Sequence, residues 1–434
     1  MSQDSSHGFS RRHFGRLLAG GAAAALAPVG LGRARAADRV WPRRAQGAGG
    51  RDERYWQEVR EQFLMPLDLA VLNAANLCPS SRPVLDTLCE ATRDVDRDPS
   101  QQNRRKLSEG KEAARRTVAA FLGATPEEIV LTRNTSEANN IVSSGLDLHA
   151  GDEVVIFGDN HPSNHRAWTD KAERFGFTVR VVDQVNPHPG GEYYLDAFTR
   201  ASNARTRLWA FTHVTNSVGD LFPVKAMCDA ARARGILTLV DGAQSFGVLD
   251  LDLATLGADF YTGSGHKWPC GPRETGVLYV RQDAQTRLQP SIISLYAGAV
   301  GISRTFEGLG QRDEPAIVAF GKALEFQANV GKAAIAERSR ALAETLIEGL
   351  GRIDGVKIWT HPDPDRSWSV VSFQPAGLDP GKLSTALYET DRIACATRGG
   401  RDRPGLRFSP HFYNLQSEVD RAVAAVAKYV KSGL

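Results

Sequence analysis

The stretch that decides the fold runs from residue 236 to residue 280, ILTLVDGAQSFGVLDLDLATLGADFYTGSGHKWPCGPRETGVLYV. It opens with the apolar run 236–240, which predicts a buried strand. Asp241 follows directly, at the carboxyl end of that strand, where open α/β sheets bind their ligands. The segment SGHK, residues 264–267, lies between two further strand-like runs. We therefore expect polar residues that bind a ligand or take part in catalysis to lie at the same edge of one sheet.

Lys267 is poorly explained as a solvated surface charge, because small residues and His266 flank it. A lysine becomes a nucleophilic amine when it is partly desolvated or lies near another cation. A pyridoxal phosphate (PLP) site requires a lysine that binds the cofactor's aldehyde and an acid, here Asp241, that pairs with the pyridine nitrogen. The alternative is a salt-bridged lysine and a turn-forming aspartate.

Two motifs carry a family resemblance, DGAQ at residues 241–244 and SGHK at residues 264–267, with Lys267 placed 26 positions after Asp241. In this the chain resembles the class V aminotransferase family of fold-type I PLP enzymes. The string HKWPCGPRETGVLY, residues 266–279, is similar to the isopenicillin N epimerase-like branch. The resemblance extends from about Tyr55 to the C-terminus. It implies PLP as cofactor and a homodimer with active sites at the subunit interface.

The rest of the pattern predicts an α/β fold. Strand-like and helix-like runs alternate from residue 128 onward, which is typical of a mostly parallel, doubly wound sheet. We assign residues 76–314 to a PLP-binding large domain and residues 315–434 to a smaller α+β domain. Residues 53–75 are expected to pack on that small domain.

The N-terminus has the features of an export signal. Arg11 and Arg12 precede a weakly apolar, Ala/Gly-rich segment, and the tripeptide ARA at 34–36 has the small-x-small pattern of a signal-peptidase site. This predicts a Tat signal peptide at 1–36, a linker at 37–52, the Tat translocon as a partner and a periplasmic location. A disordered arginine-rich tail and a mitochondrial transit peptide are the alternatives.

Composition limits the remaining functions. The chain has 434 residues, 24% of them charged, and a net charge of +3 without a basic stripe, which argues against nucleic acid. No run reaches the roughly 20 apolar residues of a membrane span. The five cysteines have no regular spacing, which argues against a disulfide framework and a zinc site but leaves one disulfide open.

A phosphate site is expected where Thr135 and Ser136 open a helix after a strand. Free backbone N–H groups at a helix start, with two hydroxyls, bind an anion without a charged side chain. The alternative is that the two residues only cap the helix. The family pattern implies that Ser264 and His266 complete the phosphate cradle.

The resemblance also implies how the ring is held. His161, in DNHPSN, corresponds to the residue that stacks on the pyridine ring, and with Lys267 and Asp241 it completes the predicted catalytic set. Asn216 is placed to bond the phenolate oxygen of PLP, and Gln244 is expected at the same edge. A lone loop histidine is otherwise a surface residue.

Two further segments concern the substrate and the partner subunit. Arg407 matches the family's substrate-carboxylate arginine, whose guanidinium binds a carboxylate through two parallel hydrogen bonds; a surface arginine is the alternative. Arg398, Arg401 and Arg403 could contact a second acidic group. Gln311, in FEGLGQRD, lies in a segment that in the family reaches the neighbouring subunit's PLP phosphate, although many members have threonine there.

These features predict an enzyme that acts at the α-carbon of an amino acid or a peptide-linked amine. Transamination, epimerisation and carbon–sulfur lysis share the first steps, and the sequence leaves them open. Desulfuration is disfavoured, because TRGGRDRPG at 397–405 lacks the cysteine that desulfurases carry there, and Cys395 lies before it. Exported enzymes of this type modify pyoverdine-like siderophore precursors, which suggests one substrate. A catalytically silent PLP-fold binding protein is the non-enzymatic alternative.

Overall fold

The computed structural model describes residues 52–295, 297–399 and 402–434. The predicted signal peptide, 1–36, lies outside the described residues, as does the predicted linker up to residue 51. None of the described helices is long and apolar enough to cross a bilayer. In the same part of the chain, no cluster of three or more His, Cys, Asp or Glu residues could hold a metal ion.

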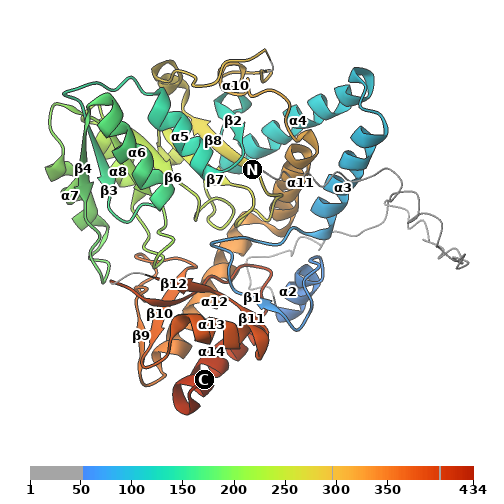
Figure 1. Cartoon of the computed structure of the whole chain (residues 1–434), viewed down its shortest axis with the longest axis vertical. Coiled ribbons are helices and arrows are strands. Elements are labelled where there is room, and N and C mark those ends of the chain that lie inside the picture. The colour runs from blue at the N-terminus through green and yellow to red at the C-terminus, as the bar shows by residue number, and fades with distance from the viewer. Residues whose placement is uncertain (1–51, 296, 400–401) are drawn as a thin grey trace, which may run out of the picture. The chain divides into compact units, whose positions relative to one another are not determined.

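A seven-stranded sheet forms the centre of the fold (Figure 1). Its spatial order is β2 (Ile129–Thr132), β8 (Gly276–Val280), β7 (Phe260–Ser264), β6 (Leu237–Asp241), β5 (Thr206–Thr212), β3 (Glu153–Phe157) and β4 (Thr178–Val182). Only β8 runs antiparallel to its neighbours. The prediction of a mostly parallel α/β sheet is confirmed.

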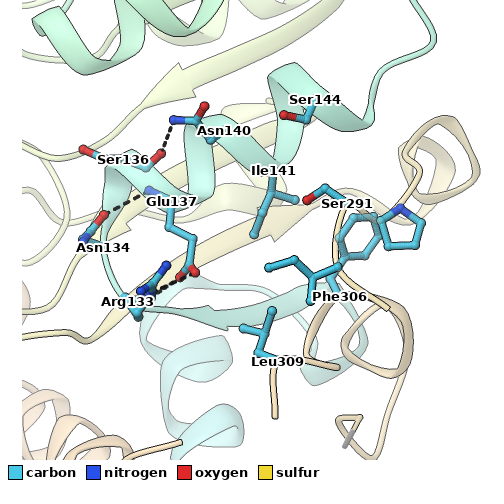
Figure 2. Close-up of a pocket in the computed structure, with 12 residues that line it drawn as sticks. Arg133, Asn134, Ser136, Glu137, Asn140, Ile141, Ser144, Ser291, Phe306 and Leu309 are labelled. Carbon is cyan, nitrogen blue, oxygen red and sulfur yellow. Dashed lines mark hydrogen bonds and ion pairs between the residues drawn. The ribbon is translucent and has the colours of Figure 1, made fainter. Parts of the chain in front are cut away.

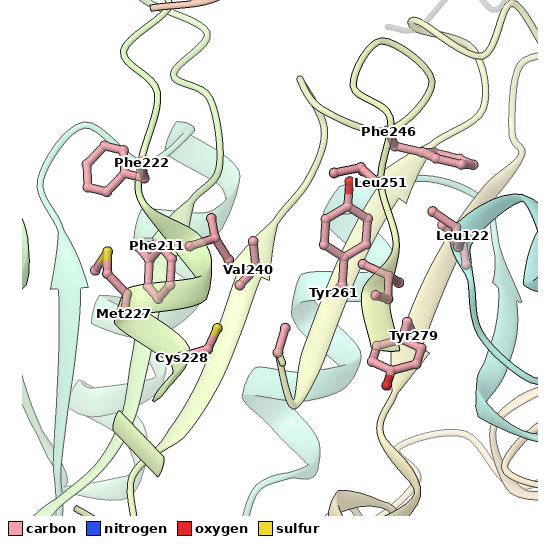
Figure 3. Close-up of a cluster of buried hydrophobic side chains, with 14 of the residues drawn as sticks. Leu122, Phe211, Phe222, Met227, Cys228, Val240, Phe246, Leu251, Tyr261 and Tyr279 are labelled. Atoms are coloured by element: carbon pink, nitrogen blue, oxygen red, sulfur yellow. The ribbon is translucent and has the colours of Figure 1, made fainter. Parts of the chain in front are cut away.

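Both faces of this sheet are buried. Alternate residues of β5 divide between two apolar clusters: Trp209 and Phe211 pack on one face, and Leu208 and Ala210 on the other. Figure 3 shows the first cluster, with Phe211, Val240 and Tyr261 projecting from successive strands. Near-continuous apolar strands are typical of a parallel sheet covered by helices on both sides.

Helices precede, separate and follow these strands along the chain. The large part of the chain contains α3 (Arg82–Arg97), α4 (Gln101–Leu122), α5 (Thr135–Gly145), α6 (Pro162–Phe175), α7 (Gly191–Ala201), α8 (Val224–Arg232), α9 (Leu253–Leu256), α10 (Ser303–Phe306) and α11 (Glu314–Val330). Strand β7 extends to Ser264, the first residue of the SGHK segment, because its ladder with β8 continues to the pair Ser264–Gly276.

A second, antiparallel sheet has the order β12 (Ala396–Arg398), β13 (Gly405–Phe408), β10 (Val371–Pro375) and β9 (Val356–Ile358). It shares an apolar core with α12 (Lys332–Gly351), α13 (Pro380–Glu389) and α14 (Gln416–Ser432).

The segment after residue 52 reaches this second core. Helix α2 (Glu53–Arg60) ends in a buried arginine that pairs with Glu418 at 3.3 Å, and β1 (Ala70–Val71) pairs with β11 (Ile393–Ala394). The domain boundaries themselves stay predictions.

Candidate active site

One pocket of about 300 Å³ collects ten of the eleven predicted site residues. They are Thr135, Ser136, His161, Asn216, Asp241, Gln244, Ser264, His266, Lys267 and Arg407. Nine of them lie at or just after the carboxyl ends of β2, β3, β5, β6 and β7, strands that run parallel and therefore end at one edge. Arg407 comes from β13 of the second sheet.

Lys267 lies at this edge with an unusually weakly basic amine. Burial lowers its pKa to about 8; the carboxylate of Asp241 acts in the opposite direction, and the charge of Arg407 adds to the lowering. No group in the described parts of the chain forms a hydrogen bond or ion pair with its Nζ atom. The unprotonated, nucleophilic amine is therefore far more populated near neutral pH than in an exposed lysine, although the protonated form still predominates at pH 7.

Asp241 is the last residue of β6. The sequence pattern had predicted that the strand ends one residue earlier, at Val240, and that Asp241 follows it. Its Oδ2 atom accepts hydrogen bonds from Asn139 Nδ2 at 2.9 Å and Asn164 Nδ2 at 3.3 Å, and its Oδ1 atom accepts one from the Ala243 N–H at 3.1 Å. These bonds fix a buried carboxylate in one orientation. In this orientation the carboxylate can pair with the protonated nitrogen of a pyridine ring, as in PLP.

Asn139 and Asn164 are functional residues that the sequence reasoning missed. Thr262 Oγ1 donates to Asn139 Oδ1, and Trp168 Nε1 donates to Asn164 Oδ1, so each carboxamide presents its NH₂ group to the aspartate. Both residues lie one helical turn inside a helix that begins at the pocket. An asparagine on the buried face of a predicted helix was the feature of the sequence that could have identified them.

The opposite end of the pocket is built from hydroxyls at the start of α5. Ser264 Oγ lies 2.8 Å from Thr135 Oγ1 and accepts the Thr135 N–H at 3.0 Å, while Ser136 Oγ donates to Ser163 Oγ. Burial lowers the pKa of His266 to about 4, so this ring is neutral at pH 7. Hydroxyls beside a helix N-terminus suit a phosphate group.

His161 caps α6, with its Nδ1 atom 2.8 Å from Ser163 Oγ. Although the residue is exposed in the single chain, desolvation of the ring lowers its pKa and the charge of Lys267 lowers it further, so a largely neutral, flat imidazole lines the pocket.

Gln244 and Asn216 also line the pocket. The Gln244 carboxamide is already engaged by protein, since it donates to the Ala75 carbonyl and accepts from Trp268 Nε1. One of its two amide N–H groups remains for the predicted ring contact. The Asn216 side chain faces the pocket, while its backbone carbonyl contributes to the position of Arg407.

Arg407 is nine-tenths or more buried and reaches across from the second sheet. It donates from Nη1 to the Asn216 carbonyl at 2.8 Å and from Nη2 to Asn73 Oδ1 at 3.2 Å. Burial lowers its pKa to about 10, and Arg398 contributes in the same direction, but the guanidinium stays charged at pH 7. Its buried Nε atom has no partner within the described residues, which leaves a donor for a carboxylate ligand. Asn73 was not predicted.

Gln311 is the predicted residue that a single chain does not bring into this pocket. It is exposed, accepts a hydrogen bond from Arg104 at 2.7 Å, and lines a neighbouring pocket with Arg133 and Glu137. Figure 2 shows a third, adjoining hollow along α5, which shares Asn134 and Ser136 with the lysine pocket. The role of Gln311 toward a second subunit stays a prediction.

The fold and the site define a class of protein, the fold-type I PLP-dependent enzymes. The residues present fit the cofactor: an unpaired lysine, an oriented aspartate, a flat imidazole and a hydroxyl cradle share one pocket. Residues 81–422 match the sequence profile of the family described as "Aminotransferase class-V", and the chain belongs to that family.

The relatives agree with this membership. The chain is similar to isopenicillin N epimerases of Amycolatopsis lactamdurans (34% identical, covering 87% of this chain and 99% of the relative) and Streptomyces clavuligerus (30%, 86% and 97%). It is also similar to a probable cysteine desulfurase of Methanothermobacter thermautotrophicus (30%, 84% and 95%).

Among solved structures, the cysteine desulfurase of Thermococcus onnurineus superposes with a TM-score of 0.79 at 25% identity, covering 87% of this chain and 98% of the other. A C-DES variant with glycine covalently linked to its PLP cofactor also gives 0.79, at 24% identity, covering 85% and 98%.

Proposed function

We propose that this PLP-dependent enzyme acts at the α-carbon of an α-amino acid or of an amino-acid unit in a peptide. The observation that carries the proposal is the shared pocket of Lys267 and Arg407, an amine nucleophile and a buried guanidinium with a free donor. When bound, PLP supplies an electron sink for the bond that breaks at the α-carbon. The protein's residues then decide which bond that is.

In this proposal Arg407 binds the α-carboxylate and orients the substrate. Lys267 would hold the cofactor and would also be the base that takes and returns the α-proton, because its lowered pKa suits that task. Asp241, with its fixed carboxylate, would keep the ring nitrogen protonated. A lysine on one face of the α-carbon could deliver the proton to another carbon, as transamination requires, whereas epimerisation would also require a proton donor on the opposite face.

Transamination and epimerisation are the two candidate reactions at the α-carbon. The names of the two epimerase relatives support epimerisation. Desulfuration is not proposed. The Cys395 thiol lies 3.5 Å from Ser384 Oγ, and burial raises its pKa to about 11, so it is neither a thiolate nor free. Its strand neighbour Ala396, not Cys395, is paired with Arg407 in the sheet.

The test is spectroscopic. Purified protein incubated with PLP is expected to show the visible absorbance of a lysine-bound cofactor, and α-amino acids are expected to shift it. The Lys267→Ala variant should fold and lack that band. A wild type that stays colourless with PLP contradicts cofactor binding, and a coloured protein indifferent to every amino acid supports a silent binding protein instead. Product analysis by chiral chromatography then separates epimerisation from transamination.

We also propose that the active unit is a homodimer. Ile292, Ile293 and Leu295 are 51%, 88% and 98% exposed in the single chain, and Ile292 lines the pockets beside α5. A second copy covering these side chains would bring its own residues to the phosphate end. Sedimentation equilibrium tests this, with Ile293→Asp expected to favour monomer.

Export to the periplasm through the Tat translocon is a further proposal, and it rests on Arg11 and Arg12 in the sequence. Lysine at both positions keeps the charge but removes the guanidinium pair. The full-length variant should stay in the cytoplasm; unchanged periplasmic accumulation would reject this proposal. A siderophore precursor as substrate would be tested by metabolite profiling of a deletion strain.

A further inference from the structure

The four-stranded sheet turns one face toward the lysine pocket. Ser372 of β10 and Arg407 of β13 are register partners, so their side chains share a face. Both donate to adjacent backbone carbonyls of the large sheet's loop, Arg407 to Asn216 and Ser372 Oγ to Ser217. Another side chain on this face next to Arg407 therefore lies on the side of the sheet that is turned toward the pocket, beside the residues that line it.

Arg398 is such a side chain. In the antiparallel pair of β12 and β13, Ala396 lies opposite Arg407 and Arg398 lies opposite Gly405. Side chains two residues apart on a strand point to the same face, so Arg398 is the diagonal neighbour of Arg407. The positive charge of Arg398 contributes to the lowered pKa of Arg407 and of His161, as expected for a guanidinium close to both.

Among the described residues on this face of the sheet, the arginine side chains outnumber the carboxylates that pair with them. Asp159 is held by Arg403 through two hydrogen bonds, at 3.1 and 3.3 Å, and also accepts one from Ser217 Oγ. Arg403 is thus neutralised. In the described ranges, by contrast, no carboxylate forms an ion pair with Arg398 or Arg407.

Partial burial lowers the pKa of Arg398 and the charge of Arg403 lowers it further, while the charge of Asp159 acts in the opposite direction without cancelling the effect. A partly buried cation without a partner is unfavourable unless a ligand supplies the anion. In the proposed function Arg407 binds the α-carboxylate of the substrate. The guanidinium of Arg398 then still lacks an anionic group with which to pair.

We propose that Arg398 binds a second anionic group of the substrate, so that the enzyme acts on amino acids that carry a carboxylate beyond the α-carbon. This rests on the proposed function, in which Arg407 binds the α-carboxylate. Arg398 is then a specificity-determining residue. It touches the distal end of the substrate and leaves the bond-breaking groups unchanged.

The test uses the holoenzyme and two matched pairs of amino acids, L-glutamate with L-glutamine and L-aspartate with L-asparagine. Each amide keeps the size of its acid but removes the distal charge. Dissociation constants come from the change in cofactor absorbance on titration. In the wild type at least one acid is expected to bind about tenfold more tightly than its amide, the range of a hydrogen bond to a charged group.

Arg398→Gln should abolish this preference while the amide binds within about twofold of wild type. Arg398→Lys, which keeps a charge, should retain part of it. The matched control is Arg352→Gln, a 79% exposed arginine directly after the C-terminal end of α12, which should leave the preference intact. Normal cofactor absorbance in each variant shows that the fold and the cofactor site persist.

Three outcomes would contradict the inference about Arg398. A preference that survives in Arg398→Gln overturns the inference. Equal binding of acid and amide by the wild type also overturns it, while the proposed function stands. If no amino acid of either kind shifts the wild-type absorbance, the proposed function fails and the inference falls with it.

Discussion

Lys267→Met tests the central physical claim about the site, that the fold destabilises the charged amine. Methionine keeps an unbranched apolar stem of similar length and removes only the charge. The lowering of the lysine pKa from 10.5 to about 8 corresponds to about 3 kcal/mol of unfavourable free energy for the protonated form. Because the side chain is only half-buried, solvent screening reduces this, and we expect about 1–3 kcal/mol in the protein without cofactor.

The sign of the pH dependence follows from proton binding. Below pH 8 both folded and unfolded chains hold the proton, so the full penalty applies and the wild type should be less stable than Lys267→Met. Between pH 8 and 10.5 the unfolded chain binds the proton that the folded chain has lost. Stability of the wild type therefore rises with pH over this window relative to the variant.

The assay is urea unfolding of both cofactor-free proteins at several pH values from 7 to 10. The wild-type deficit should be largest at pH 7 and should shrink as pH approaches 10. The control variant, Lys382→Met, changes an exposed lysine and should show no such trend. A difference between wild type and Lys267→Met that is independent of pH, or that grows toward pH 10, would refute the reasoning.

Three other substitutions separate the roles of the remaining groups. Arg407→Ala should weaken α-amino-acid binding by about 2–5 kcal/mol, because a buried charge pair is lost; titration of the cofactor band measures it, and unchanged affinity would contradict the assignment. Asp241→Asn should leave that affinity nearly unchanged but slow turnover by orders of magnitude, as steady-state kinetics would show. Arg115→Met should destabilise the fold by about 3–5 kcal/mol in urea, since it leaves the Glu307 carboxylate, 1% exposed, without its buried partner. A near-neutral Arg115→Met would show that water or Lys111 compensates.

Much of the site was predictable because it belongs to one kind of element, the loop after a parallel strand. An apolar run followed by Asp241, and another followed by the segment with Lys267, are local patterns, and parallel strands bring their carboxyl ends to one edge. Thr135 and Ser136 were recognisable in the same way. Local chemistry and a single topological rule were sufficient for these positions.

The sequence by itself thus determined the sheet and the family, and it predicted the lysine and its aspartate at one edge of that sheet. The tertiary structure decided which distant side chains orient and complete them. Asn139 and Asn164 became hydrogen-bond donors to Asp241 only because α5 packs against β6 and α6 packs against α5 and β3. Asn73 became a partner of Arg407 only across 334 positions of chain. Arg398 and Arg403 look alike in an arginine-rich segment, yet Arg403 is neutralised by Asp159, whereas Arg398 lies in β12 beside Arg407 and has no ion pair within the described residues. Pairing of charges depends on distances in space, which strand register sets and local sequence does not contain.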